Sequence, residues 1–312
     1  MREYQEINQV VLLDKPTGVS SNHILQRVKR LLRAKKAGHT GCLDPLATGM
    51  LPICLGEATK FSSYMLEADK VYRVVAKWGE QTDTADSTGA VIQTSEGRPV
   101  RAQIEAALPA FLGQISQVPP MYSALKHQGK PLYKLARQGE VIERAARLIE
   151  IFSLTCLASD AETATFEVHC SKGTYIRTLV EDIAQHLGTL AHVIDLRRLR
   201  VGHYQAEQMI TWEALQHWAE NKAEGFAESK TDLQEVAPFF FPVESLLAGL
   251  PTLQLTAEEA LRVTQGQRVV LSEAQMLAEC LVLYDPQHRL LGVGECDLNS
   301  RVLHAKRLVA SQ

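Results

Sequence analysis

Apolar residues in the first quarter of the chain recur with the spacings of strands and of one helix. Residues 9–14 (QVVLLD) form a short apolar run that predicts a strand. After a turn, five apolar residues recur at helical spacing: Ile24, Leu25, Val28, Leu31 and Leu32. Either Ser20 or Ser21 stands where a helix cap belongs. Residues 71–78 (VYRVVAKW) are β-branched and aromatic, which predicts another strand before a polar hairpin or loop.

The middle of the chain continues with strands and helices. Residues 102–112 predict a short helix, and residues 163–170 (TATFEVHC) alternate as a half-buried strand does. A helix that ends at Gly188 is indicated by apolar residues on one face: Ile176, Leu179, Val180, Ile183 and Leu187. Residues 193–201 (VIDLRRLRV) predict a further strand with three arginines.

The last hundred residues change character twice. An acidic, helix-prone tract covers residues 205–250, and its proline-flanked PFFFP segment predicts the end of a helix. Thr256 and Glu259 then form the pattern of a capping box. Residues 276–284 predict a strand, followed by turn residues and a second strand. We therefore expect a small β-rich domain at residues 251–312.

A glycine-rich stretch at residues 38–56 (GHTGCLDPLATGMLPICLG) interrupts this pattern, and we interpret it as a loop. Asp44 stands directly before Pro45, which disfavours helical geometry at the aspartate. Gly41 and Gly49 bracket it and permit a positive φ or a close backbone approach. A carboxylate held on such a loop suits a nucleophile or a base. An Asx-turn or helix-cap aspartate is the structural alternative.

Composition places the chain among ordinary globular proteins. It has 312 residues with 46% hydrophobic and 22% charged residues, and its N-terminus shows no signal peptide or membrane span. The six cysteines form no C-x-x-C pair, which favours free thiols in a reducing cytoplasm. The net charge of −3 is unevenly distributed, because residues 27–36 hold six basic residues and no acid. This basic segment fits nucleic acid, although a solvated helix face explains it equally well.

Residues 118–147 combine prolines, lysines, arginines and stacking side chains with little apolar periodicity. We interpret them as an excursion from the core that contacts nucleic acid. The alternative is a surface helix after a proline-rich lead-in.

Common cofactor and metal motifs are missing from the sequence. It has no phosphate-binding G-x-x-x-x-G-K-[ST], dinucleotide fingerprint, H-E-x-x-H or G-x-S-x-G. We therefore expect side-chain chemistry without a metal or cofactor, with Asp44 as the leading acid. Arg177 is a plausible electrostatic partner, which would hold Asp44 ionised and lower its pKa.

Six segments together resemble the TruB-type tRNA pseudouridine synthases, in chain order and over nearly the whole length. They are LLDKPTGVSSN (12–22), GHTGCLDPLATGMLPICLGEATKF (38–61), DKVYRVVAKWGEQTDTADSTG (69–89), PPMYSALKHQGKPLYKLARQG (119–139), CSKGTYIRTLVEDIAQHLG (170–188) and HVIDLRRLRVG (192–202). The C-terminal LRVTQGQRV and YDPQHRLLGVGE resemble a PUA domain, a small RNA-binding module. The resemblance is weakest at residues 205–250. Cys42 departs from it, because the family often has a small residue there.

This resemblance implies a mixed α/β (α+β) catalytic domain on a large mixed sheet at residues 1–250, with residues 118–147 as an RNA-gripping insertion. A PUA-like domain at residues 251–312 would follow. The implied reaction isomerises uridine 55 of the tRNA T-loop: the base is flipped out, the glycosidic bond breaks, and carbon 5 is joined to the ribose. Asp44 would act as nucleophile or base.

The resemblance also assigns the neighbours of Asp44. Arg177 would pair with it, and Tyr72 would stack on the uracil and assist removal of its carbon-5 proton. Tyr175 and Leu196 would line the uracil pocket, and His39 would fill the space left by the flipped base. Without the resemblance, core packing explains Tyr72 and Leu196, and a loop-bracing hydrogen bond explains His39. Lys15 is expected to support the loop.

The expected partner is tRNA, bound through its T-arm by a cytoplasmic monomer that needs no membrane, guide RNA or protein partner. Three cations are predicted to contact it: Lys29, Arg30 and Lys126. Two other functions stay open. A tRNA-binding folding chaperone would use the same surface with incidental catalysis, and a nucleoside or glycoside hydrolase would need a second acid that the sequence does not show.

Overall fold

The structure, a computed structural model, describes residues 4–221, 237–275 and 278–310. A ten-stranded mixed sheet forms its centre, with strands in the order β13-β1-β3-β12-β4-β11-β10-β7 and with β14 and β2 added beside β1 and β3. The bounds are β1 Gln9–Lys15, β2 Ala37–His39, β3 Thr48–Leu55, β4 Lys70–Trp78, β7 Gly113–Gln117, β10 Arg147–Ser159, β11 Thr163–Cys170, β12 Ala191–Val201, β13 Ile210–Thr211 and β14 Phe240–Pro242. The mixed α/β fold on a large sheet is as expected from the sequence.

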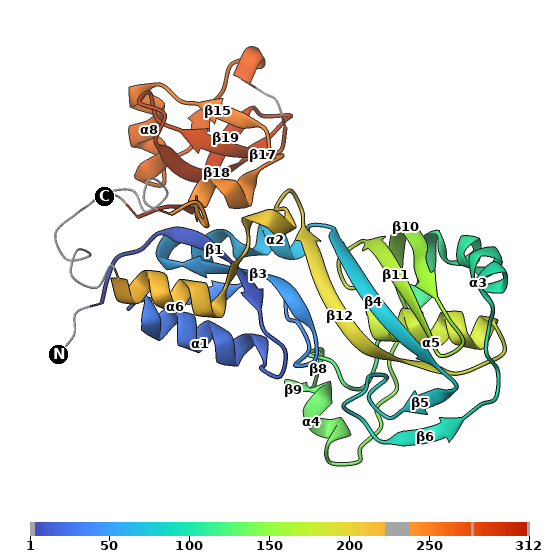
Figure 1. Ribbon diagram of the computed structural model, residues 1–312. Coiled ribbons are helices and arrows are strands. Elements are labelled where there is room, and N and C mark those ends of the chain that lie inside the picture. Colours follow the sequence, from blue (N-terminus) through green and yellow to red (C-terminus); the bar gives the residue numbers. More distant parts are fainter. Residues whose placement is uncertain (1–3, 222–236, 276–277, 311–312) are drawn as a thin grey trace.

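Helices cover both halves of this sheet and its ends (Figure 1). The α-helices are α1 Ser21–Leu31, α2 Ser62–Glu67, α3 Arg101–Ala107, α4 Leu132–Ala136, α5 Ile176–His186, α6 Trp212–Asn221 and α8 Ala257–Thr264. The 3-10 helices are η1 Gly56–Phe61, η2 Leu108–Phe111, η3 Ala206–Gln208, η4 Val243–Leu247 and η5 Glu273–Gln275. Two hairpins complete the larger part, β5 Glu80–Thr82 with β6 Val91–Thr94, and β8 Lys126–His127 with β9 Lys130–Pro131.

The apolar pattern of the sequence decides which face each helix covers. The buried face of α1 packs on β1 and β3 through Ile24, Leu25 and Val28, and Ser20 caps the helix by accepting from the His23 N–H. The apolar face of α5 packs on β4, β11 and β12 in a separate cluster that contains Ile176. Leu43 and Ala47, in the segment before β3, belong to the α5 cluster, whereas Leu51 and Ile53 of β3 belong to the α1 cluster.

A five-stranded sheet forms the C-terminal β-rich domain, shown orange and red in Figure 1. Its strands are β15 Thr252–Gln254, β16 Val269–Val270, β17 Cys280–Tyr284, β18 Leu290–Asp297 and β19 Val302–Leu308, in the order β15-β17-β18-β19-β16. The predicted Thr256–Glu259 capping box is present at the start of α8. The domain packs on the larger part through η1, where Lys60 Nζ donates to Leu308 O at 3.0 Å and Glu57 accepts from the Ala310 N–H at 2.5 Å.

Several expectations need correction. The stretch at residues 38–56 is not a single loop, because its second half is β3, whose apolar run is buried on both faces. The PFFFP segment was expected to end a helix, but it contains β14, which pairs with β1. The strand expected at residues 276–284 starts at Cys280, and residues 276–277 lie outside the described part, as do residues 222–236 of the acidic tract. The long strand β10 and the strand β19 were not predicted.

Candidate active site

The loop at residues 40–47 joins β2 to β3 and carries Asp44. Ser21, the first residue of α1, fixes one side of it: its hydroxyl donates to Leu43 O at 3.0 Å and accepts from the Leu43 N–H at 2.8 Å. The turn after β1 fixes the other side, where the Gly18 N–H donates to Pro45 O at 2.8 Å. The backbone on each side of Asp44 is therefore anchored, which limits the positions that its carboxylate can take.

Lys15 also anchors the loop, through hydrogen bonds from its ammonium group. Its side chain is fully buried, and Nζ donates to the carbonyl oxygens of Val19 at 2.8 Å, Pro16 at 2.9 Å and Pro45 at 3.4 Å. Burial lowers the pKa of Lys15 to about 8, although the nearby Asp44 carboxylate opposes the shift. Lys15 thus supports the loop, as the resemblance suggests, and also adds positive charge beneath it.

Asp44 forms the ion pair that was expected with Arg177. Arg177 Nε lies 2.9 Å from Asp44 Oδ2 and Nη2 lies 3.2 Å from Oδ1, a two-point contact. The arginine side chain is 5% exposed, whereas 38% of the aspartate side chain is exposed. The guanidinium therefore forms a buried support, and the carboxylate is still accessible to a substrate.

The pKa of Asp44 was expected below its ordinary value, and this expectation is wrong. Removal of the carboxylate from water raises its pKa, the Asp86 carboxylate raises it further, and Arg177 and Lys15 only partly oppose these effects. The site holds a carboxylate that is reachable yet poorly solvated. Such a group is a stronger base and nucleophile than an ordinary surface aspartate.

Arg177 is itself held in place by groups that the sequence reading missed. Nη1 donates to Thr84 O at 2.6 Å, and Nη2 donates to Tyr122 O at 2.7 Å. The carboxylate of Asp86, which is also buried, lies 3.8 Å from Nη1. The polar sequence at residues 81–90 predicts only a hairpin or loop, although its aspartates among threonines are a signal for a structured polar network.

Tyr72 and Leu196 lie beside the loop in one apolar cluster with Leu43 and Ala47. Tyr72 is on β4 and Leu196 on the adjacent β12, and both are buried. Burial raises the pKa of the Tyr72 hydroxyl, and Arg198 opposes this shift. The tyrosine is therefore a neutral ring on the Asp44 side of the sheet.

Tyr175 stands at the N-terminal end of α5, two residues before Arg177. Its backbone is fixed by the Gln117 side chain, which accepts from the Tyr175 N–H at 2.8 Å and donates to its carbonyl oxygen at 3.1 Å. Burial raises the pKa of its hydroxyl, and the charges of Asp44 and Arg177 both act on it. The structure thus brings Tyr175 close to the ion pair.

His39 is on β2, before the loop. Burial and the Arg198 charge lower its pKa, so the ring is neutral at physiological pH. Within the described residues, its Nδ1 atom is buried and has no hydrogen-bond partner. The loop-bracing hydrogen bond considered from the sequence is therefore not found through Nδ1.

The three cations predicted to contact RNA lie outside this cluster. Lys29 and Arg30 are in the last turn of α1, and Arg30 and Lys126, which is on β8, are exposed. None of the three takes part in an ion pair within the described residues. In Figure 1, the β8–β9 hairpin and α4 lie at the bottom of the view, below the large sheet.

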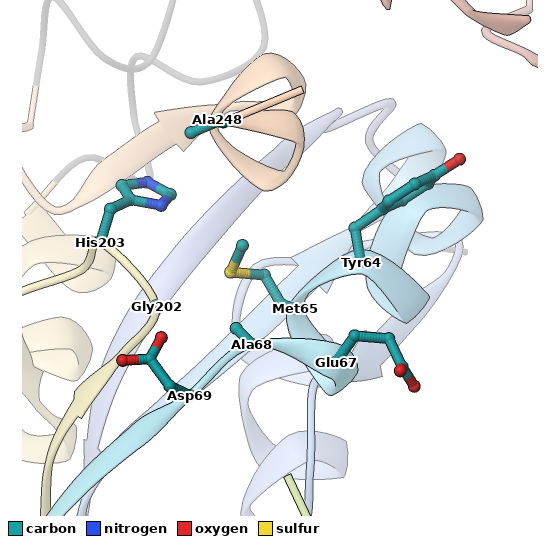
Figure 2. Close-up of a pocket in the computed structure, with 9 residues that line it drawn as sticks. Tyr64, Met65, Glu67, Ala68, Asp69, Gly202, His203 and Ala248 are labelled. Atoms are coloured by element: carbon teal, nitrogen blue, oxygen red, sulfur yellow. The ribbon is translucent and has the colours of Figure 1, made fainter. Parts of the chain in front are cut away.

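A cavity of about 450 Å³ lies elsewhere, between α2, the turn after β12 and the end of η4. Figure 2 shows the side chains of Met65, Asp69 and His203 around it. It includes none of the predicted site residues. The described residues contain no cluster that could hold a metal ion. They also contain no helix long and apolar enough to cross a membrane.

Comparisons with known proteins identify the chain over most of its length. Residues 29–176 match the N-terminal domain of the TruB family pseudouridylate synthases, residues 177–248 match the tRNA pseudouridylate synthase B C-terminal domain, and residues 251–309 match the C-terminal domain of pseudouridine synthase II TruB. The tRNA pseudouridine synthase B of Mannheimia succiniciproducens is 51% identical over 305 residues, which are 98% of this chain and 97% of that protein. The protein of the same name from Pasteurella multocida is 49% identical over 98% of this chain and 96% of its own length.

Solved structures agree in fold. The crystal structure of a Cbf5–Nop10–Gar1 complex contains a chain with a TM-score of 0.71 and 25% identity, over 94% of this chain and 79% of that one. An H/ACA RNP bound to a substrate RNA containing 2′-deoxyuridine gives a TM-score of 0.72 at 21% identity, over 97% of this chain and 85% of that one. The fold and these matches define a pseudouridine synthase, an isomerase. The chain belongs to the TruB family of these enzymes.

Proposed function

We propose that this enzyme isomerises uridine 55 in the T-loop of tRNA to pseudouridine, with Asp44 as the essential side chain. The observation that carries the proposal is the geometry of Asp44: a carboxylate on an anchored loop, 38% exposed and held at two points by a buried arginine. The names of the relatives, tRNA pseudouridine synthase B, support tRNA as the substrate.

The chemistry requires access to an atom that a stacked loop conceals. The uridine must be flipped out, which costs a few kcal/mol, and base–aromatic stacking offsets roughly 1–3 kcal/mol of this cost. The bond between ribose C1′ and uracil N1 then breaks, the uracil turns, and C1′ is joined to C5. The proton on C5 leaves and N1 gains one, so the reaction is an isomerisation that consumes no oxidant or cofactor.

The surrounding residues suit the parts of this reaction. Asp44 acts at the ribose as a nucleophile or as a base, and Arg177 orients and balances its charge. Tyr72 stacks on the uracil and assists removal of the C5 proton, while Tyr175 and Leu196 line the base pocket. His39 fills the space that the flipped base leaves. The buried positions of Tyr72 and Leu196 beside the loop support these roles.

The partner and its binding surface follow from the same proposal. Lys29, Arg30 and Lys126 contact the T-arm, with residues 118–147 as the gripping insertion. The presence of this insertion supports an enzyme that acts without guide RNA or a protein partner. We also propose that the enzyme is a cytoplasmic monomer. We divide the chain into a catalytic domain at residues 1–250 and a PUA-like RNA-binding domain at residues 251–312.

The decisive experiment follows tritium release from T-arm RNA labelled at uridine carbon 5, together with mapping of pseudouridine in a mixed tRNA pool. Wild-type protein should release tritium and modify position 55, and Asp44→Asn should bind the RNA without release. Undiminished tritium release by Asp44→Asn would show that Asp44 is not the essential side chain. Modification at another uridine would refute the position.

A tRNA-folding chaperone is the second candidate, favoured by the exposed cations that lie apart from Asp44. Complementation of a deletion strain separates the two functions. Full rescue under stress by Asp44→Asn would show that binding is the function there, whereas failure to rescue would assign it to catalysis.

A further inference from the structure

Arg198 lies in the middle of β12, at the point where three strands of the sheet meet. It is the register partner of Gly49 on β3 and of Tyr72 on β4. Register partners place their side chains on the same face of a sheet, so Arg198 and Tyr72 share the face that carries Asp44. The Arg198 side chain is nonetheless out of contact with solvent, since the residue is 1% exposed.

The Arg198 guanidinium links two segments that flank Asp44. Nε donates to Met50 O on β3 at 2.7 Å. Nη2 donates to Gly41 O at 3.3 Å, and Nη1 donates to Cys42 O at 3.5 Å, both in the loop. One planar group thus connects the first residues of the Asp44 loop to the strand into which the loop continues.

A buried arginine normally has a carboxylate partner, because an unpaired buried charge costs several kcal/mol. Across residues 4–221, 237–275 and 278–310, no carboxylate lies within ion-pair distance of Arg198. Three backbone oxygens accept hydrogen bonds from it, and a side-chain hydrogen bond from Arg198 also acts on the Tyr72 hydroxyl and opposes the rise of its pKa. A neutral apolar residue of similar length would fill the same space without the charge, so packing alone does not explain an arginine here.

We propose that Arg198 is a positioning residue for the isomerisation, which fixes the Asp44 loop and the Tyr72 ring to one point of the sheet. This inference rests on the proposed function. Asp44 lies on the loop before β3 and Tyr72 lies on β4, and the two would act on opposite parts of one nucleotide, the ribose and the base. Their separation must be held to a fraction of an ångström for both to act.

The glycines on the neighbouring backbone fit this role. Gly49 has a φ of +95°, and a Cβ at this position would lie 2.2 Å from Arg198 O. Glycine therefore allows the start of β3 to approach β12 at Arg198 itself. Gly41 has a φ of +111°, which turns its carbonyl in a conformation that other residues rarely adopt.

The test compares Arg198→Met and Arg198→Lys with Arg197→Met. Arg197 is the next residue on the same strand and points to the opposite face, where it pairs with Asp14 at 2.7 Å and 2.9 Å. Tritium release is measured in single turnover at saturating T-arm RNA, and the dissociation constant is measured separately.

Arg198→Met should lower the rate about 100-fold and change the dissociation constant by less than about threefold. Arg198→Lys should recover only part of the rate, because one ammonium cannot span the carbonyl oxygens that the guanidinium joins.

The exposed thiol of Cys42 reports on the loop without catalysis. The rate of Cys42 alkylation is measured at alkaline pH, where the thiolate predominates. A Cys42→Ala protein gives the alkylation of the other cysteines, which is subtracted. Arg198→Met should speed alkylation because Cys42 O loses its donor, and Arg197→Met should leave the rate unchanged.

Two results would overturn the proposal. One is that Arg198→Met has the same rate of tritium release and the same rate of Cys42 alkylation as Arg197→Met. The other is that Arg198→Lys releases tritium at the same rate as the wild-type protein. This second result decides the question if Arg198→Met does not fold. If the wild-type protein releases no tritium, the proposed function fails, but the alkylation comparison still shows whether Arg198 fixes the loop.

Discussion

The loop at residues 40–47 and the segment at residues 118–147, our proposed insertion, both contact Arg177 but are held in different ways. Buried groups anchor the loop, among them the Ser21 hydroxyl and the Lys15 ammonium. The insertion consists of a two-stranded hairpin and the five-residue helix α4, with Lys126 exposed to solvent. The loop therefore has little freedom, whereas the insertion presents Lys126 to solvent on a two-residue strand.

This difference corresponds to two functions, the chemical reaction and the binding of RNA. A reaction that joins specific atoms needs a fixed carboxylate, while binding of a phosphate backbone tolerates some movement of its cations. Arg177 connects the two regions, because Nη2 donates both to Asp44 Oδ1 and to Tyr122 O in the insertion. Substitutions in the loop should change the chemical step, substitutions in the insertion should change affinity, and only Arg177 should change both.

The largest effect is expected for Asp44→Asn. The amide keeps the shape but cannot act as nucleophile or base, so single-turnover isomerisation should fall by about 10⁴-fold or more. The dissociation constant for T-arm RNA should stay close to that of wild type. Asp69→Asn is the matched control, since Asp69 pairs with Arg200 beside the cavity that contains no site residue. A tenfold weaker affinity of Asp44→Asn for T-arm RNA would contradict this comparison, because the loop would then contribute to RNA binding as well as to the reaction.

Stability should respond to the same substitution in a direction set by the raised pKa of Asp44. A carboxyl group with a raised pKa in the folded state binds its proton more tightly there, so it favours folding below its unfolded pKa. This contribution is lost as pH rises through the folded pKa. The free energy of unfolding of Asp44→Asn, relative to wild type, should therefore increase from acidic to neutral pH. A constant difference in denaturation experiments would contradict the shift.

The second largest effect is expected for Arg177→Gln. Loss of the two-point contact and of the bond to Tyr122 O should reduce the rate about 10²–10³-fold and also weaken RNA binding. Arg177 lowers the pKa of Asp44, so its removal should move the acidic limb of the pH–rate profile to higher pH. Single-turnover rates across pH test this. An unmoved limb would mean that a group other than Asp44 titrates.

Much of this division could be predicted from the sequence. The helix that carries Arg177 follows from local apolar periodicity and the strand that carries Tyr72 from its β-branched and aromatic residues, and the structure has both. The resemblance then placed Arg177 against Asp44, a contact 133 residues apart that periodicity cannot give. Contacts between neighbouring residues leave a local pattern, whereas contacts across the sheet do not.

The missed features have physical reasons of the same kind. The glycines and prolines of residues 38–56 predict a loop where β3 lies, yet Pro52 pairs with Leu12 and its carbonyl accepts from the Thr40 N–H at 3.2 Å. Arg198 appeared as one of three strand arginines, and only the order β3-β12-β4 places it beneath the loop. The direction of the Asp44 pKa was misjudged because burial is a property of the whole fold.

A third, smaller effect is expected for Lys15→Met, which removes an anchor but no reacting group. The loop should become mobile and the rate should fall about 10–100-fold, with little change in affinity. The pKa of Lys15 is about 8, so the wild-type rate should also decline as pH rises through this value. Lys15→Met should lack that decline. A profile with the same alkaline limb in both proteins would assign the limb to another group.

The smallest effect is expected for the three cations predicted to contact RNA, and it sharpens the comparison most. Lys126→Ala should weaken T-arm binding only severalfold and lower the slope of log K against log salt by about 0.7–0.9, as for one lost phosphate contact. Single-turnover rate at saturating RNA should be unchanged, and Lys29→Ala and Arg30→Ala should behave alike. Arg73→Ala is the control, because Arg73 is exposed on the opposite face from Tyr72 and pairs with Glu167 at 3.1 Å. If Lys126→Ala slowed the chemical step at saturation, the insertion would belong to the catalytic apparatus, and the distinction between a fixed loop and a merely binding insertion would fail.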